Sequence, residues 1–479
     1  MYDGLEAGRW IVVSGERTDV GVERGKIDPD VEGVAGIEAS ELVMLAGVEH
    51  KPHTTIDAFG NERERAGDTL HTYLTFSEPL AYTYKRDTVT INANVVKASH
   101  GETREEVLGS GDGTKSFQTF PLRQTPHLTY RSAPTVSGVE STLEVRVNGI
   151  RWPEQETLLD LDGDERGAVT STDDDGTVTV RFGDGSHGAR LPTGVENVSA
   201  VYRTGIGRSG NVDAGAISTL ASRPLGVQSV LNPEPATGGA DPEGRDQARQ
   251  NAPLAVLALD RLVSVEDYAS FARTYAGIGK AHADQLTDGR RSVVHLTIAG
   301  AEDAPIDVRS DLYRNLRRSL RRYGDPSVPL QVDLREAVFL VVVAKVKIHD
   351  AYLWESVAPE IRAALLDTFS FDRRELGQDV RYSEVVAAMQ AVDGVDLVDI
   401  DLLDGITETD ATDPEVLAGR LDALGASAAE AAPPPDRVRA ETTRLVSVSG
   451  SSENTIRPAQ IAYLNPELPD TLILTEVTL

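Results

Sequence analysis

The stretch that decides the fold runs from Val180 to Asn211 and reads VRFGDGSHGARLPTGVENVSAVYRTGIGRSGN. At both ends apolar and polar residues alternate, which is the period of a half-buried β-strand. The alternating apolar residues are Val178, Val180 and Phe182 on the first side, and Val198, Ala200 and Tyr202 on the second. We therefore predict two strands joined by a long, glycine-bearing connection that supports a contact surface.

Three glycines of this stretch raise a nucleotide-binding hypothesis. Gly205, Gly207 and Gly210 fit the G-x-G-x-x-G spacing, which lets a backbone approach a pyrophosphate. That motif requires a helix to begin there and an acidic residue about twenty positions later. Instead NVDAGAIST follows, and residues 230–233 hold no carboxylate. We infer that no dinucleotide binds here, and we expect the glycines of the stretch to shape backbone turns.

Length and hydropathy indicate a multidomain protein outside the membrane. The chain has 479 residues, of which 40% are hydrophobic. This length favours about three domains and allows sizeable cores. No run approaches the roughly eighteen apolar residues of a membrane span, and the first residues show no basic-then-apolar signal. We expect no direct membrane insertion and no secretion signal.

Charge and cysteine content exclude several classes of function. The absence of cysteine rules out disulfides, thiolate metal sites and cysteine nucleophiles. A net charge of -29, from 76 acidic and 47 basic residues, repels phosphate backbones, so we expect no nucleic-acid partner. Only eight of the basic residues are lysine. A salt-loving source and a GC-rich genome both explain this bias, and the two explanations stay open.

The pattern along the chain predicts an α+β multidomain fold. It has a β-rich amino-terminal half, two α+β sandwich-like units in the carboxyl-terminal half, and a C-terminal arm. The predicted domains are a β-rich module at 1–120, a β-rich module with the FGDG/LPTG loop at 121–232, a linker at 233–254, α+β units at 255–335 and 336–405, an acidic alanine- and proline-rich arm at 406–440, and a β segment at 441–479.

Capping and turn signals place individual elements. A hairpin is expected to turn at Asp175-Gly176, and Ser264 is expected to cap a helix with Asp267 three residues later. Further predictions are a strand from Arg291, a helix with Leu312, Leu316 and Leu320 ending near Gly324, a central strand from Phe339, a helix capped near Ser356, a helix and strand at 383–392 and 395–403, a short helix from Asp413, and a closing strand TLILTEVTL.

No motif for catalysis or metal binding is present. The nine histidines form no H-E-x-x-H pair, and neither a P-loop nor a G-x-S-x-G elbow occurs. DLDGDERGAV from Asp160 spaces carboxylates like a calcium loop, but Glu165 occupies the sixth position, which requires glycine. We expect a solvated acidic turn there, no cofactor, no metal and no enzymatic activity.

One local contrast is a basic helix face in an acidic protein. We name Arg314, Arg317, Arg318, Arg321 and Arg322 the arginine ridge. They share a predicted helix with the leucines at 312, 316 and 320. A solvated face of an amphipathic helix is one explanation, and its last arginines would suit the helix dipole. A docking surface for an acidic partner is the other.

Several blocks of sequence resemble the baseplate J-like family of contractile phage tails and related injection systems. In family order they are FGDGSHGARLPTG, VYRTGIGRSGNV, NPEPATGGADPE, RDQARQNAPLA and RLVSVEDYASFART. DTFSFDRRELGQDVRYSEVVAAMQAVDGVDLVDI is similar to the family's carboxyl-terminal region. LEAGRWIVVSGERTDV and AYTYKRDTVTINANVVKASHGETREEVLGSG are similar to its long baseplate-assembly branch. The residues that carry the resemblance are Gly183, Asp184, Gly185, Gly188, Pro192, Gly194, Gly210, Asn211, Asn232, Pro233, Gly238, Gly239, Asp267 and Tyr268.

The resemblance implies a structural, non-enzymatic wedge component of a baseplate. Its implied partners are a sister wedge protein, other copies of itself, and the hub, tube and sheath proteins of a sixfold particle. Assembly would take place in the cytoplasm, before incorporation into a virion-like or injection particle. Members of the long branch commonly carry further sequence before LEAGRW, and it stays open whether a separate chain or domain supplies the contacts made there.

Two alternatives accompany this interpretation. A particle-associated hydrolase or carbohydrate-binding module would need a concave site with convergent carboxylates. The C-terminal segment IRPAQIAYLNPELPDTLILTEVTL could add a strand to a neighbour's sheet, or it could fold back onto its own domain.

Overall fold

The computed structural model divides the chain into two compact units. The N-terminal unit comprises Met1–His100 with Gly210–Ala236, and the main unit comprises Gly101–Ser209 with Thr237–Leu479. Residues 210–232 therefore belong to the same compact unit as the first hundred residues. The sequence pattern had assigned them to the predicted module 121–232. The structure describes residues 2, 4–18, 36–56, 62–64, 68–123, 128–173, 175–257, 262–287, 292–412, 416–421, 435–447 and 454–477.

The N-terminal unit is built on an antiparallel sheet of order β5-β2-β1-β6. Its strands are β1 (Trp10–Glu16), β2 (Glu38–Lys51), β5 (His71–Phe76) and β6 (Thr90–Asn92), beside a small hairpin of β3 (Thr54–Ile56) and β4 (Glu62–Glu64). Alternate residues of β1 and β2 form the core, with Ile11, Val13, Val43 and Leu45 buried. The period-two pattern of the sequence therefore fills one face of this sheet.

The main unit begins with a two-sheet β module. One sheet has the order β12-β11-β15-β7 and the other β13-β14-β8. The strands are β7 (Glu102–Gly109), β8 (Thr119–Pro121), β11 (Glu144–Val147), β12 (Ile150–Trp152), β13 (Ala168–Thr172), β14 (Val178–Phe182) and β15 (Val198–Thr204). The two predicted strands are confirmed as β14 and β15, whose alternate side chains are buried. The hairpin turn is also confirmed, since Thr172 pairs with Val178.

A three-stranded module follows. Its elements are α1 (Arg245–Leu257), α2 (Val265–Thr274), β16 (Ile278–Thr287), β17 (Ser292–Gly300), α3 (Asp311–Tyr323) and β18 (Leu330–Leu334). β16 pairs antiparallel with β17, and β17 pairs parallel with β18 through the α3 crossover. Apolar residues of α2 and α3 pack on one face of this sheet, against Val294, Leu296 and Ile298.

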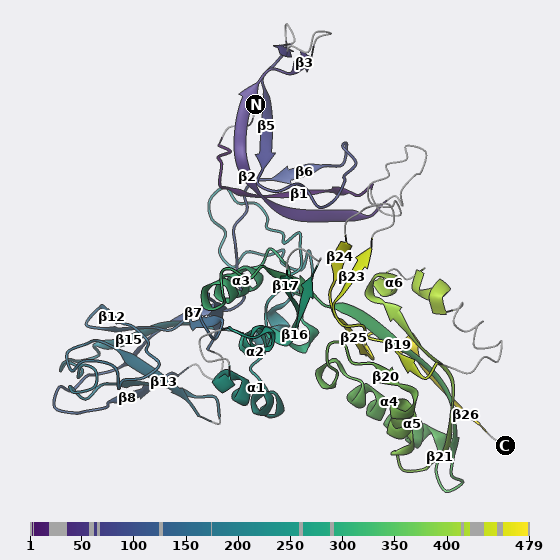
Figure 1. The fold of residues 1–479 in the computed structure, drawn as a ribbon. Coiled ribbons are helices and arrows are strands. Elements are labelled where there is room, and N and C mark those ends of the chain that lie inside the picture. The colour runs from purple at the N-terminus through teal and green to yellow at the C-terminus, as the bar shows by residue number, and fades with distance from the viewer. Residues whose placement is uncertain are drawn as a thin grey trace. The chain divides into compact units, whose positions relative to one another are not determined.

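The C-terminal module is organised around the long strand β19. Its elements are β19 (Glu336–Ile348), α4 (Trp354–Thr368), β20 (Val380–Arg381), α5 (Tyr382–Gln390), β21 (Val395–Thr407), α6 (Glu408–Thr412), β22 (Arg437–Val438), β23 (Arg444–Ser447), β24 (Asn454–Arg457), β25 (Gln460–Tyr463) and β26 (Leu472–Glu476). Helices α4 and α5 cover one face of the β19-β21 sheet (Figure 1). The predicted α+β class of this half is therefore confirmed.

Short elements complete the chain. The hairpin of β9 (Tyr130–Ser132) and β10 (Val139–Ser141) lies in the main unit. In the described part of the chain, 3-10 turns occur at η1 (Gly207–Gly210), η2 (Ala301–Asp303), η3 (Phe371–Arg373) and η4 (Pro469–Thr471). No α-helix starts at Gly205, which agrees with the rejection of a dinucleotide site. Within the described residues no helix is both long and apolar enough to cross a membrane.

The structure corrects two local predictions. The second half of the predicted linker 233–254 is helical, because α1 starts at Arg245 and tolerates Pro253 among strong helix formers. Ser356 does not cap its helix, because the amides of Ser356 and Val357 already donate to the Leu353 carbonyl. Asp413, the predicted start of a short helix, lies outside the described residues; residues 416–421 beyond it are helical.

The structure also decides between the two alternatives for the carboxyl terminus. β25 and β26 both pair in parallel with β19 of the same chain, so the segment completes its own sheet. Buried Ile461 and Leu472 hold it there. Of the two alternatives, folding back onto its own domain is therefore the one that the structure shows.

Candidate functional sites

The FGDG turn is held by hydrogen bonds within the turn and by close backbone packing at two of its glycines. The Asp184 carboxylate accepts hydrogen bonds from the amides of Ser186 (2.8 Å) and His187 (2.7 Å). These bonds hold the pKa of Asp184 below its ordinary value. A β-carbon at Gly183 would lie 2.2 Å from the Gly188 carbonyl oxygen, and Gly188 itself has φ +77°. Both positions therefore require glycine.

The LPTG loop docks on the neighbouring segment 109–113 of the same module. The Gly194 amide donates to the Gly111 carbonyl (3.1 Å), and the Gly111 amide donates to the Asn197 side chain (2.8 Å). The Asn197 amide group in turn donates to the Pro192 carbonyl (3.1 Å). Pro192 and Gly194 thus shape the loop.

In the N-terminal unit, Asn232 closes the base of a long loop. Its side-chain amide donates to the Asp213 carbonyl (2.9 Å), and its oxygen accepts from the Ile217 amide (2.8 Å). We name residues 211–232 the Asn232 loop. Between 214 and 231 it has a single charged residue, Arg223. Leu225 and Leu231 are 107% and 65% exposed, so this ordered loop presents apolar side chains to water.

The other glycine and proline positions of the resemblance serve the backbone. A β-carbon at Gly210 would lie 2.7 Å from the His100 ring, within the N-terminal unit. Gly185 and Gly238 have positive φ, and Pro233 is half-buried. Asn211 and Gly239 each have an interaction partner. None of these residues converges with another on a common site.

The predicted cap at α2 is confirmed. The Ser264 hydroxyl accepts from the Asp267 amide (3.2 Å), and the Asp267 carboxylate accepts from the amides of Ser264 (2.7 Å) and Val263 (2.9 Å). The backbone donors lower the pKa of Asp267. Tyr268, one residue later, is buried in the core of the three-stranded module. Both residues have structural roles.

The arginine ridge lies on α3 with every one of its five side chains exposed. Arg314 pairs with Asp311 at 3.0 Å, whereas Arg317, Arg318, Arg321 and Arg322 form no ion pair with any residue that the structure describes. The opposite face of α3 buries Leu312, Leu316 and Leu320 in the core. The amphipathic helix is thus confirmed, and the ridge is its solvent face.

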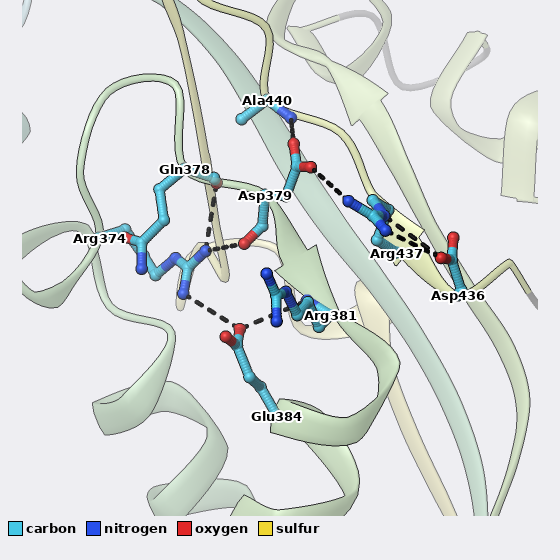
Figure 2. A network of polar contacts seen from close by, with 8 residues as sticks. All are labelled: Arg374, Gln378, Asp379, Arg381, Glu384, Asp436, Arg437 and Ala440. Atoms are coloured by element: carbon cyan, nitrogen blue, oxygen red, sulfur yellow. Dashed lines mark hydrogen bonds and ion pairs between the residues drawn. The ribbon is translucent and has the colours of Figure 1, made fainter.

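Sequence reasoning missed a buried arginine that clamps a loop of the C-terminal module. Figure 2 shows the Arg374 guanidinium directed at the Asp379 carbonyl (2.6 Å), the Gln378 carbonyl (3.2 Å) and the Glu384 carboxylate (3.5 Å). Burial lowers the pKa of Arg374, and the Glu384 charge opposes that shift. Its Nε is buried without a partner among the described residues. The loop from 374 to 381 is therefore folded around one cation.

Asp379 extends this clamp to a distant segment. Its carboxylate accepts from the Ala440 amide (3.0 Å) and pairs with Arg437 (3.4 Å), as Figure 2 shows. β20 and β22 pair beside these contacts. In the sequence, this loop is marked by the charged run RRELGQD, residues 373–379. The run does not indicate which of its two arginines is buried.

A second network joins the three-stranded and C-terminal modules. Arg335 donates to Asp303 (2.7 Å) and to Glu408 on α6 (2.9 Å), and the Tyr463 hydroxyl donates to Asp303. Burial and the Asp303 charge raise the pKa of Tyr463. The contacts tie η2, β25 and α6 to the start of β19. This arrangement fixes two modules in place and leaves no free acid or base for catalysis.

A groove beside β24 has both of its lining carboxylates engaged within the chain. It has a volume of about 760 Å³ and is lined by Asp333 and Glu336 together with β24 residues such as Ile456. Asp333 accepts from buried His295 (2.7 Å), and Glu336 pairs with Arg457 (3.1 Å), so both carboxylates have partners. Across the described parts of the chain, no three histidine or acidic side chains gather closely enough to hold a metal ion.

Comparisons with known proteins agree with this structural character. A family profile described as the Baseplate J-like protein barrel domain matches residues 155–239, and one described as the Baseplate J-like central domain matches residues 260–333. The first match contains the FGDG and LPTG loops, and the second covers the three-stranded module from just before α2. No curated protein sequence matches the chain.

Two solved structures are similar to the chain. One is the anti-feeding prophage baseplate, with 12% identity over 63% of this chain and 72% of that chain, at a TM-score of 0.28. The other is the TssK-TssF-TssG baseplate subcomplex of a type VI secretion system, with 13% identity over 57% of this chain and 55% of that chain, at a TM-score of 0.20. Residues 155–239 and 260–333 thus match baseplate J-like domains, and these matches support a baseplate-related structural role.

Proposed function

We propose that the chain is a wedge component of the baseplate of a contractile, phage-tail-like injection system. It pairs with a sister wedge protein and with other copies of itself, and it links the hub, tube and sheath to the baseplate periphery. It assembles in the cytoplasm and then remains in the particle. The observation that carries the proposal is the pair of family matches in chain order, the barrel domain at 155–239 and the central domain at 260–333.

The polar networks support a static, load-transmitting role. Arg374 and Arg335 each donate hydrogen bonds to other residues of the same chain. The Glu336 carboxylate in the groove is paired with Arg457. Hydrogen bonds from one buried cation to several segments restrict the movement of the elements that they join. A component that transmits force between tube, sheath and periphery needs such rigidity. We therefore propose no enzymatic activity and no cofactor.

The Asn232 loop supports a role in assembly. Long loops without secondary structure are usually functional when their ends are held together. Leu225 and Leu231 stand exposed in a loop that Asn232 orders, so its burial against a partner would cost little conformational entropy. We propose that this loop docks on another baseplate protein.

Particle imaging tests the wedge assignment. The chain should copurify with contractile particles from its source, and electron microscopy of particles carrying a tagged chain should show sixfold density at the baseplate. Finding the chain only as a free monomer beside intact particles would contradict the assignment. Turnover of a glycan substrate by the purified chain would favour the particle-associated hydrolase instead.

Point variants test the loop. Leu225→Asp with Leu231→Asp should strongly reduce incorporation into particles, because charged side chains resist burial at an interface. Val96→Asp with Val195→Asp is the matched control, since Val96 and Val195 are 84% and 88% exposed and lie outside the loop. Normal incorporation of the double variant would show that the loop does not contact a partner in the particle. The wedge assignment would still stand.

A further inference from the structure

The arginine ridge concentrates unpaired positive charge in a protein of net charge -29. Arg317 and Arg321 are four residues apart on α3, as are Arg318 and Arg322, so the four guanidinium groups lie on adjacent turns. All four are exposed, and none forms an ion pair within the described residues. The helix dipole accounts for arginines in the last turn but not for those one turn earlier.

Two other faces of α3 are fixed, so the ridge is presented on a rigid support. Leu316 and Leu320 are buried in the core of the module. On a second side, the Asn315 side chain donates to the Ser132 hydroxyl (3.2 Å), and the Ser319 hydroxyl donates to the Thr135 carbonyl (3.2 Å). Asn315 and Ser319 are themselves buried. Because two faces of α3 are held by these contacts, the arginine side chains stay on the face that is exposed to solvent.

Aromatic contacts hold part of the ridge in place. The Arg317 guanidinium lies 5.8 Å from the centre of the Tyr313 ring, and that of Arg322 lies 5.5 Å from the centre of the Tyr323 ring. Such contacts restrict the side chains without neutralising them. Ordered guanidinium groups lose less entropy when they bind carboxylates than freely rotating ones do.

A matching acidic surface exists in the two-sheet β module. Asp160, Asp162, Asp164 and Glu165 are exposed, and within the described residues none of them forms an ion pair. The sequence excludes calcium from this turn because Glu165 stands where glycine is needed. Four carboxylates in one turn thus face the solvent, as do the four guanidinium groups of the ridge.

We propose that the arginine ridge of one copy docks on the acidic turn 160–165 of a second copy. The two surfaces differ, so the contact is heterologous and repeats from copy to copy. It closes into a ring where the rotation between copies permits, and otherwise it extends as an open chain. The inference rests on the pairing of copies in the proposed function, and it adds the two surfaces that make the contact.

Sedimentation equilibrium of the full purified chain at low ionic strength tests the proposal. The wild-type chain should self-associate, and the association should weaken as potassium chloride is added, because salt screens exposed charges. Arg318→Glu with Arg322→Glu should weaken association by about tenfold or more, as like charges now face each other. Asp162→Arg with Asp164→Arg should do the same.

The charge swap gives the decisive comparison. A chain carrying all four substitutions restores opposite charges across the contact and should regain at least part of the lost association. Arg86→Glu with Arg439→Glu is the matched control, since it makes the same change in net charge at exposed arginines elsewhere. Unchanged thermal melting of each variant would show that the fold is intact.

Three outcomes would overturn the inference. They are a wild-type chain that stays monomeric at every concentration, a ridge variant that associates like wild type, and a control that loses association equally. Each would leave the wedge assignment standing, since that assignment depends on the particle imaging and not on self-association of the isolated chain.

Discussion

Arg374 and the arginine ridge place the same side chain in opposite surroundings. The Arg374 side chain is 5% exposed; it donates hydrogen bonds to two backbone carbonyls and forms an ion pair with Glu384. The arginines at 317, 318, 321 and 322 are exposed on α3 and have no carboxylate partner among the described residues. The first cation holds a loop together, whereas the others are available to another surface.

The difference teaches where a charge matters for stability. A buried cation repays its desolvation only through complete hydrogen bonding, so removal of one partner leaves the remaining groups stranded. An exposed cation loses little hydration and contributes little to folding. Substitutions at the two places should therefore separate stability from assembly, and the following predictions are ordered by the expected effect.

Arg374→Ala should have the largest effect. It removes the charged donor of the Gln378 and Asp379 carbonyls and leaves a cavity in place of a buried side chain, so we expect the free energy of unfolding to fall by about 3 kcal/mol or more. Urea denaturation followed by circular dichroism measures this. Arg374→Lys should lose less, because a lysine keeps the charge but not the fork of donors. A loss below about 1 kcal/mol for the alanine variant would show that the clamp is dispensable.

Gly183→Ala should come next, and it tests whether the FGDG turn belongs with the buried clamp as a structural element. Its new methyl group would meet the Gly188 carbonyl, so the backbone must shift at a cost of about 1–3 kcal/mol. Gly244→Ala is the control, because nothing lies within 4 Å of the position and its φ is not positive. Equal stability of the two variants in thermal denaturation would contradict this role.

Ser264→Ala should cost about 1 kcal/mol, since it removes a helix cap. The cap also predicts a pH dependence. The folded pKa of Asp267 is lowered, so its contribution is present above the unfolded value and is lost as the pH falls through the folded value, below about pH 4. Asp267→Asn should flatten the acid limb of a stability profile. If the stability of Asp267→Asn fell at low pH as steeply as that of wild type, the cap would not contribute to the acid sensitivity.

Arg317→Gln with Arg318→Gln should have the smallest effect on stability, within about 0.5 kcal/mol of wild type, because both side chains are exposed and unpaired. Thermal melting measures it. A loss of stability comparable to that of Arg374→Ala would show that the ridge, like Arg374, stabilises the fold.

The sequence predicted the elements whose side chains repeat with a clear period. β14, β15 and α3 were predicted correctly because burial on one face imposes alternation or a four-residue spacing. The cap at Ser264 was predicted because its donors and acceptors are four consecutive residues. By contrast, α1 was missed because Pro253 is a local breaker that the helix tolerates.

The candidate sites depended more on the tertiary structure. Arg374 could not be separated from Arg373 by sequence, yet the first is buried and the second is exposed. The exposure of the Asn232 loop was equally hidden, because Asn232 acts through contacts with residues up to 19 positions away. A local pattern cannot report which charged or apolar side chain will meet water.

By itself, the sequence determined the β-rich and α+β halves, the glycines of the FGDG turn, and the family resemblance. Those properties follow from periodicity and from backbone geometry within a few residues. Only the tertiary structure decided that β25 and β26 complete their own sheet, that residues 210–236 join the first hundred residues, and that the ridge stays unpaired. These depend on contacts between distant segments, whose formation no local spacing encodes.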